Sequence, residues 1–304
     1  GLNSFMEFLA ETAWEDNFPS RRGEARNIVD YMRSTNQVPV MTNAESTLQR
    51  GNNAYAKPAT ALNILRETVM GRDLFDFSFK QYAQRWAFKH PEPADFFRTM
   101  EDASAVDLDW FWRGWFYGTQ PVDIALTNVN WYSIDSQDPD KEKTRLKNQR
   151  DKEPLSISEQ RNKTSIPKYR IDTYPELSDF YTKYDALEIT EYDRKQYKEY
   201  YEALDQKQKD ALKAGINYYI LDFENVGGLV MPIILEMEYQ DGTKEMVRIP
   251  AEIWRKNNKK VSKMIVTKKP VKQFTVDPFQ ETADINLNNN YFPAKTVDSK
   301  FQLF

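Results

Sequence analysis

The chain has 304 residues, 40% of them hydrophobic and 14% aromatic, which is enough apolar material for about two domains with packed cores. Its net charge of −4 at pH 7 and its pI near 5.4 argue against a nucleic-acid binder, which would present a basic surface. The sequence has no cysteine, which excludes disulfides, thiolate nucleophiles and cysteine-type zinc sites, and it has no apolar run of about 18 residues that could span a membrane.

The beginning of the chain predicts two amphipathic helices. Apolar residues recur at helical spacing from Leu2 to Ala13, with Phe5, Met6 and Leu9 between them. Nothing in the sequence caps the start of this helix, so we expect the chain to be a fragment of a longer protein. A second helix is expected to open at residues 19–20, and the polar residues 34–51 are expected to form a loop.

Residues 51–65, GNNAYAKPATALNIL, begin as a polar loop and continue with the spacing of a helix. Pro58 suits a first helical turn, because the N–H that proline lacks would be unpaired there. The helix is expected to run to Val69 and to end at Gly71. Tyr55 stands where the loop ends, so its hydroxyl could face a cleft. The alternative for this stretch alone is an aromatic ring packed on the core.

The rest of the first 121 residues predicts further helices. An aromatic stripe at helical spacing is expected to be core, and it consists of Phe75, Phe79, Tyr82 and Trp86. His90 is the only histidine and is expected in a loop between helices. A single histidine cannot supply the two-histidine ligand set of a zinc peptidase. Two more helices are expected to begin at Pro93 and Asp107.

From Val122 the apolar period changes to two, which predicts strands. Residues 135–168 are rich in charged side chains and are expected to be a solvated insertion with local disorder. Residues 174–215 return to helix and carry six tyrosines, which could form a face that binds sugar or peptide, or could pack a helical hairpin on the sheet. These tyrosines are Tyr181, Tyr184, Tyr192, Tyr197, Tyr200 and Tyr201.

The final third of the chain predicts a β-sandwich. Short strands are expected at residues 218–223, 233–239, 247–249, 263–266 and 274–276. The turn Asp241-Gly242 predicts a hairpin in which both central residues have positive φ.

Three segments, taken together, resemble the aminopeptidase N family of zinc metallopeptidases, the gluzincins. They are GLNSFMEFLAETAWE at 1–15, AYAKPA at 54–59 and DFFRTMEDASAVDLDWFWRGWFYGTQPVD at 95–123. Residues 220–304 look like the C-terminal β domain of some bacterial members. The resemblance implies an α+β multidomain protein, in which residues 1–121 are the helical half of a thermolysin-like catalytic domain. Residues 122–304 would form a β-sandwich-like domain with a charged, helical insertion at about 135–215.

The resemblance also implies a function. It equates Tyr55 with the family's catalytic tyrosine, whose phenol donates to the oxyanion formed when a peptide is hydrolysed. The family's zinc ligands would lie upstream of Gly1, so this chain is expected to hold no metal ligand and to be inactive alone. The parent would then be a zinc-dependent aminopeptidase acting on peptides, with the N-terminal half of the same protein as partner. Relatives of this type are often exported by bacteria, which points to the periplasm.

Two features keep alternatives open. Pro58 stands where the family usually has glycine, which restricts Lys57 and favours a non-catalytic member that binds or scaffolds. Residues 122–304 could instead be an independent interaction module. The remaining carboxylates have no histidine partner and are expected to lie on solvated helix faces; they are Glu7, Glu11, Glu15, Glu101 and Asp102.

Overall fold

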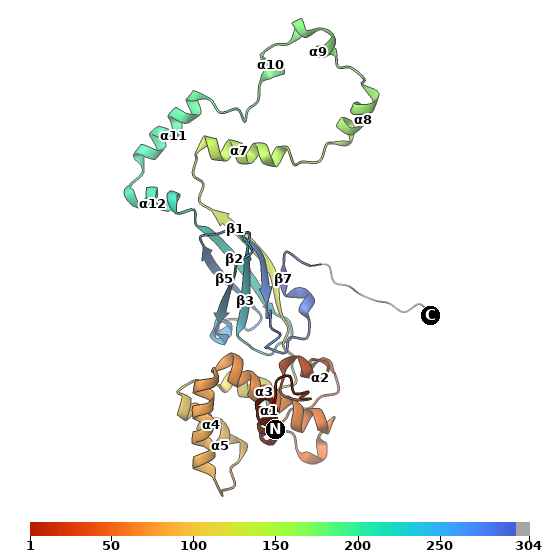
Figure 1. Ribbon diagram of the computed structural model, residues 1–304, viewed down its shortest axis with the longest axis vertical. Coiled ribbons are helices and arrows are strands. Elements are labelled where there is room, and N and C mark those ends of the chain that lie inside the picture. Colours follow the sequence, from red (N-terminus) through yellow and green to blue (C-terminus); the bar gives the residue numbers. More distant parts are fainter. Residues whose placement is uncertain (296–304) are drawn as a thin grey trace. The chain divides into compact units, whose positions relative to one another are not determined.

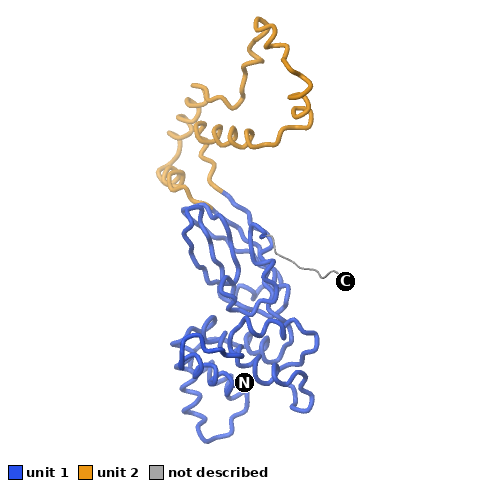
Figure 2. The backbone as a smooth tube through the Cα atoms, turned by 45° about the vertical axis from the view of Figure 1, so that its right-hand side comes forward, with its two compact units in different colours: residues 1–132, 218–304 blue, residues 133–217 orange. Residues whose placement is uncertain are grey.

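The computed structural model describes residues 1–295 and shows a mixed helix and sheet protein of the α+β class (Figure 1). The chain divides into two compact units (Figure 2). We call residues 1–132 with 218–295 the main unit, and residues 133–217 the insertion. None of the described helices combines the length and the apolar composition needed to cross a lipid bilayer.

Helices make up the first part of the main unit. They are α1 (Leu2–Trp14), α2 (Val29–Arg33), α3 (Lys57–Ile64), α4 (Arg72–Trp86), α5 (Pro93–Ser104) and α6 (Asp109–Trp115). Short 3₁₀ turns occur at η1 (Ala25–Ile28) and η2 (Ala44–Ser46), and π-helical turns at η3 (Gly51–Ala56) and η4 (Leu65–Val69). The helix α1 packs on α3, and α4 packs on α5. The rings of Phe5 and Phe75 meet edge to face at 5.5 Å, which joins α1 to α4 in one core.

The structure differs from the predicted elements at three places. The second helix does not open at residues 19–20 but begins at Ala25, because Gly23 has a φ of +103° that no helix accommodates. The buried face of α1 is formed by Ser4, Phe5 and Phe8, whereas Met6 is exposed. The predicted loop around Tyr55 is instead the π-helical turn η3, which continues directly into α3.

The strands form two sheets in the main unit. One sheet has the order β1 (Ile124–Ser133), β2 (Asn217–Asn225), β5 (Lys260–Thr267). The other has the order β4 (Lys244–Ile249), β3 (Ile233–Tyr239), β6 (Val271–Val276), β7 (Tyr291–Phe292), and all its neighbours are antiparallel. Two 3₁₀ turns, η6 (Ala251–Arg255) and η7 (Leu287–Asn289), lie between strands.

One hydrophobic core connects the sheets with each other and with the helices. Alternate residues of β2 point inward, and the ring of Tyr219 lies 5.3 Å from that of Phe274 on the other sheet. The backbone N–H of Val271 donates to the hydroxyl of Tyr219 at 2.8 Å, which satisfies this buried polar group. Trp115, at the end of α6, is fully buried, and its indole N–H points at the sulfur of Met231 at 3.4 Å.

The hairpin between β3 and β4 forms at Asp241-Gly242, but with a different turn from the predicted one. Gly242 has a φ of +80°, whereas Asp241 is not among the residues with positive φ. The carboxylate of Asp241 accepts from the backbone N–H of Thr243 at 3.0 Å, so a side chain supplies part of the turn.

The insertion is helical throughout most of its length. Its elements are α7 (Pro139–Arg150), α8 (Ile157–Ser165), α9 (Arg170–Thr173), η5 (Pro175–Leu177), α10 (Phe180–Lys183), α11 (Glu191–Ala203) and α12 (Gln206–Ala214). The predicted disorder within 135–168 is therefore wrong for α7 and α8. Asp138 caps α7, and Ser156 with Glu159 forms a capping box at the start of α8.

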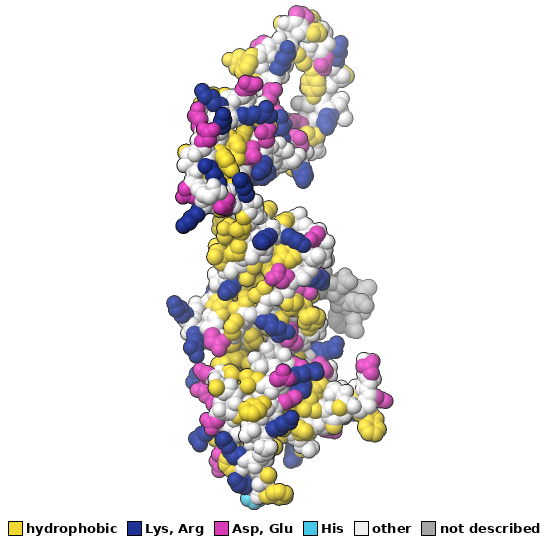
Figure 3. Space-filling model, turned by 60° about the vertical axis from the view of Figure 1, so that its left-hand side comes forward, with side chains coloured by type: hydrophobic (Ala, Val, Ile, Leu, Met, Phe, Trp, Pro, Cys, Tyr) yellow, Lys and Arg dark blue, Asp and Glu magenta, His cyan; other side chains and the backbone are white. Residues whose placement is uncertain are grey.

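The insertion buries very little. Pro139 is the one buried residue within its described helices. Lysine, arginine, aspartate and glutamate side chains alternate over its visible face (Figure 3). The contact between α7 and α11 is instead held by charge, with Lys143 Nζ 2.7 Å from a carboxylate oxygen of Asp193.

Candidate functional site

Tyr55 lies in η3, at the point where a wide helical turn passes into α3. Every residue of α3 is buried, so the helix after Tyr55 is fixed by packing on all sides. The tyrosine itself is 42% exposed. The alternative in which its ring packs into the core therefore does not describe this residue.

The start of α1 lies directly beside Tyr55. The backbone nitrogen of Gly1 donates to the carbonyl oxygen of Ala54 at 3.0 Å. Gly1 also packs closely on Pro58, since a Cβ at Gly1 would come within 2.8 Å of the proline Cβ. Segments about fifty residues apart in sequence thus meet at the residue before the exposed Tyr55.

Lys57 is the next unusual residue of this segment. It is fully buried, and its ammonium donates to the carbonyl oxygen of Gly118 at 3.1 Å. Burial lowers the pKa of Lys57 to about 8, because removing a charge from water disfavours the protonated form. The bond connects the end of η3 to the residues that follow α6. Lys57 therefore holds the segment of Tyr55 in place from inside the protein and does not face solvent.

Arg22 covers one side of Tyr55. Its guanidinium carbon lies 5.3 Å from the centre of the tyrosine ring, within the range of a cation–π contact. Burial of the Gly1 amino group lowers its pKa, and the charge of Arg22 lowers it further. One face of the phenol ring thus lies next to a positive charge.

Two of the hollows that reach α1 lie near Gly1 and Arg22. An apolar one of about 320 Å³ is lined by Gly1, Ala54, Pro58 and the aromatic rings of α5, among others. A polar one of about 290 Å³ has Glu7 and Glu11 of α1 on its lining together with Arg21 and Arg22. The sequence placed both glutamates on a solvated helix face, and the structure adds that they border a groove.

The described residues do not provide a zinc site. Within residues 1–295, no three side chains of the His, Cys, Asp or Glu type are grouped so that they could hold a metal ion. His90 lies in the connection between α4 and α5, where it is exposed. The zinc ligands that the resemblance implies would lie ahead of Gly1, so these residues are not assigned to a metal.

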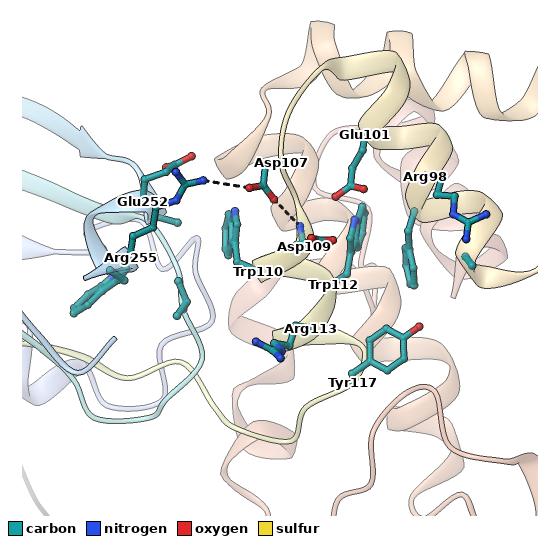
Figure 4. A pocket seen from close by; sticks show the side chains of 15 residues that line it. Arg98, Glu101, Asp107, Asp109, Trp110, Trp112, Arg113, Tyr117, Glu252 and Arg255 are labelled. Atoms are coloured by element: carbon teal, nitrogen blue, oxygen red, sulfur yellow. Dashed lines mark hydrogen bonds and ion pairs between the residues drawn. The ribbon is translucent and has the colours of Figure 1, made fainter. Parts of the chain in front are cut away.

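A larger hollow than these two, of about 740 Å³, is formed by α5, α6 and η6 (Figure 4). Its floor is aromatic, with Trp112, Trp254 and Phe97 nearly fully buried. Arg255 reaches across from η6 to Asp107 and pairs with it at 3.2 Å.

Glu101 lines this hollow, and its environment differs from the one predicted from the sequence. It was expected on a solvated face, but it is half-buried, and its carboxylate accepts from the backbone N–H of Leu108 at 3.0 Å. Burial raises the pKa of Glu101. Four carboxylates and three arginines line this hollow in total, so its charges nearly cancel and they do not indicate one class of ligand.

The tyrosines of the insertion do not form a single cluster. The ring of Tyr197 lies 6.0 Å from that of Tyr201 on α11, and Phe180 lies 5.3 Å from Tyr184 at α10. Tyr181 is 84% exposed. Tyr197, Tyr200 and Tyr201 are half-buried, and Lys209 Nζ lies 5.5 Å from the centre of the Tyr201 ring.

A scan against known protein-family models finds no match to this chain, and a search of curated proteins finds none either.

Proposed function

We propose that this chain is the C-terminal portion of a zinc-dependent aminopeptidase of the gluzincin type, which removes N-terminal residues from peptides. The observation that carries the proposal is the position of Tyr55. Its phenol is exposed at the start of α1, the helix that the family resemblance places next to the metal. In the same proposal the main unit consists of the helical half of a thermolysin-like catalytic domain and a β-sandwich.

The chemistry assigned to Tyr55 is that of a hydrogen-bond donor. When water adds to the scissile carbonyl, negative charge develops on the carbonyl oxygen. A fixed O–H group aimed at that oxygen stabilises the transition state more than the substrate, which raises the rate. The buried helix α3 and the Lys57 to Gly118 bond keep the segment in place, so the donor need not be ordered during the reaction.

The zinc ligands belong, in this proposal, to residues that precede Gly1. The chain by itself is then inactive, and its partner is the N-terminal half of the same protein. Its apolar hollow at Gly1 and Pro58 is consistent with a surface that another part of the protein covers.

One observation favours a second candidate, a non-catalytic relative that binds or scaffolds. Pro58 replaces the family's usual glycine and packs closely against Gly1. The proline sits in the first turn of α3, where it is compatible with a helix, and Tyr55 stays exposed beside it. The geometry therefore gives the first candidate more support than the second.

The test is a comparison of Tyr55→Phe with the parent sequence, in the protein that includes the residues ahead of Gly1. Aminoacyl chromogenic substrates are hydrolysed with zinc present, and kcat is expected to fall by about two to three orders of magnitude in the variant. Tyr117→Phe is the matched control, because Tyr117 is also an exposed tyrosine of the main unit. The activity of this variant should equal that of the parent. Equal activity of Tyr55→Phe and the parent would contradict the proposal. An inactive parent would instead favour the non-catalytic candidate.

A further inference from the structure

Arg22 is half-buried beside a groove that Glu7 and Glu11 also line. Among the described residues, neither Arg22 nor its neighbour Arg21 forms an ion pair. A charge that is partly removed from water usually has a counter-charge nearby. What Arg22 has is the ring of Tyr55, 5.3 Å from its guanidinium carbon.

The loop that carries Arg22 is fixed from two sides at the next residue. Gly23 has a φ of +103°, and a Cβ there would lie 2.4 Å from the ring of Phe8 on α1. Its carbonyl oxygen accepts from the side-chain amide of Asn63 on α3 at 3.1 Å, in a buried bond. No residue other than glycine fits at this position without displacing Phe8. Arg22 is therefore presented by a rigid support that is independent of Tyr55.

We infer that Arg22 is a positioning residue for Tyr55, holding the phenol ring in its exposed orientation and keeping a permanent positive charge beside it. The effect of Arg22 on catalysis rests on the proposed function, whereas the positioning of the Tyr55 ring by Arg22 does not.

Two physical effects follow from this arrangement. The attraction between the cation and the ring face restricts the rotamers of this exposed side chain. The guanidinium also stays charged over the whole working range of pH, so its field at a developing oxyanion does not titrate away. Arg21 shares the loop, but within residues 1–295 only Arg22 makes a cation–π contact with this ring, so Arg21 provides a control in the same segment.

The first experiment uses this chain, labelled with ring-fluorinated tyrosine, and the resonance of residue 55 is assigned by its loss in Tyr55→Phe. In Arg22→Gln we expect that resonance to narrow and to move toward the position of the free amino acid, because the ring becomes mobile. Arg22→Lys keeps a cation and should restore most of the parent spectrum. Arg21→Gln should leave the resonance unchanged. An unchanged resonance in Arg22→Gln would overturn the inference.

The second experiment measures kinetics of the same variants in the protein with its preceding residues. Arg22→Gln is expected to lower kcat about fivefold with KM unchanged, and Arg22→Lys to recover most of the loss. A rise in KM at constant kcat would mean that Arg22 binds substrate and does not position Tyr55, which contradicts the inference. If Tyr55→Phe itself proves harmless, the proposed function fails, and the fluorine spectra still decide whether Arg22 holds the ring.

Discussion

The main unit and the insertion treat charge in opposite ways. The main unit buries single ionisable groups without a partner of opposite charge, such as Lys57 in α3 and Asp284 after β6. The insertion also pairs charges in contact with water, as in Arg194 with Asp140. The difference shows where ionisation affects stability, because a buried unpaired charge costs far more than an exposed pair contributes.

Among the groups compared, Asp284 is expected to have the largest effect on the pH dependence of the free energy of unfolding. Burial raises the pKa of Asp284 to about 7, outweighing the backbone N–H groups of Ile124 and Asn286 that donate to it. The folded state therefore holds a proton that the unfolded state releases between the ordinary aspartate pKa and pH 7. The contribution of Asp284 to the free energy of unfolding should fall by about 4 kcal/mol as the pH rises through this window.

Asp284→Asn removes the titrating group, so we expect the pH dependence between pH 4 and 7 to flatten by about that amount in urea denaturation. Asp16→Asn, at an exposed position in the turn after α1, should keep the dependence of the parent. A slope shared by all three proteins would mean that Asp284 does not carry the effect.

Lys57 is expected to give the next largest effect, with the opposite sign. Its pKa is lowered to about 8 by burial, so the unfolded state binds more protons than the folded state above that pH. Stability from this group should increase from pH 8 toward the ordinary lysine value, by about 3 kcal/mol in total.

In Lys57→Met this rise should be absent, and the measurement is again urea denaturation as a function of pH. Lys80→Met on the exposed face of α4 is the control, and it should behave like the parent. If Lys57→Met keeps the full increase, then the ammonium is not buried as the structure shows.

The smallest effect on stability is expected for the ion pair of the insertion. Three hydrogen bonds lower the pKa of Asp193 to about 2. They come from the ammonium of Lys143, the backbone N–H of Thr190 and the hydroxyl of Thr190. Its contribution is present above about pH 4 and is lost as the pH falls toward 2. Lys143→Met should reduce the helical content of the insertion slightly at neutral pH, measured by circular dichroism, and leave the unfolding of the main unit unchanged.

Added salt should remove most of the difference between Lys143→Met and the parent, because the pair is close to solvent. Lys195→Met on α11, whose side chain is exposed, is the control for the loss of a positive charge. A large loss of stability in Lys143→Met would show that the insertion depends on charge as strongly as the main unit does.

The sequence predicted most strands and helices because their apolar periods are long and regular. It missed features that depend on single backbone positions or on tertiary contacts. Gly23 delays the second helix through a contact with Phe8, which no local pattern reveals. The charged stretch that contains α7 gave the signal of disorder, although Asp138 and Pro139 provide a helix start that could have been recognised.

The candidate site was predictable only in part. The pattern around Tyr55 located the residue, but its exposure follows from η3, a π-helical turn that sequence reasoning assigned to a loop. Arg22 was not singled out at all. Its sequence offers two adjacent arginines before a glycine, and only the fold shows which of them covers the tyrosine ring.

The most direct test of the central claim compares the binding of a transition-state analogue with catalysis. A phosphinic peptide carries the charged oxygen that Tyr55 is proposed to stabilise, whereas a substrate in its ground state does not. In the protein with its preceding residues, Tyr55→Phe should weaken binding of the phosphinic peptide by the same factor as it lowers kcat/KM. Unchanged affinity for the phosphinic peptide, with or without a loss of activity, would contradict the role assigned to the phenol.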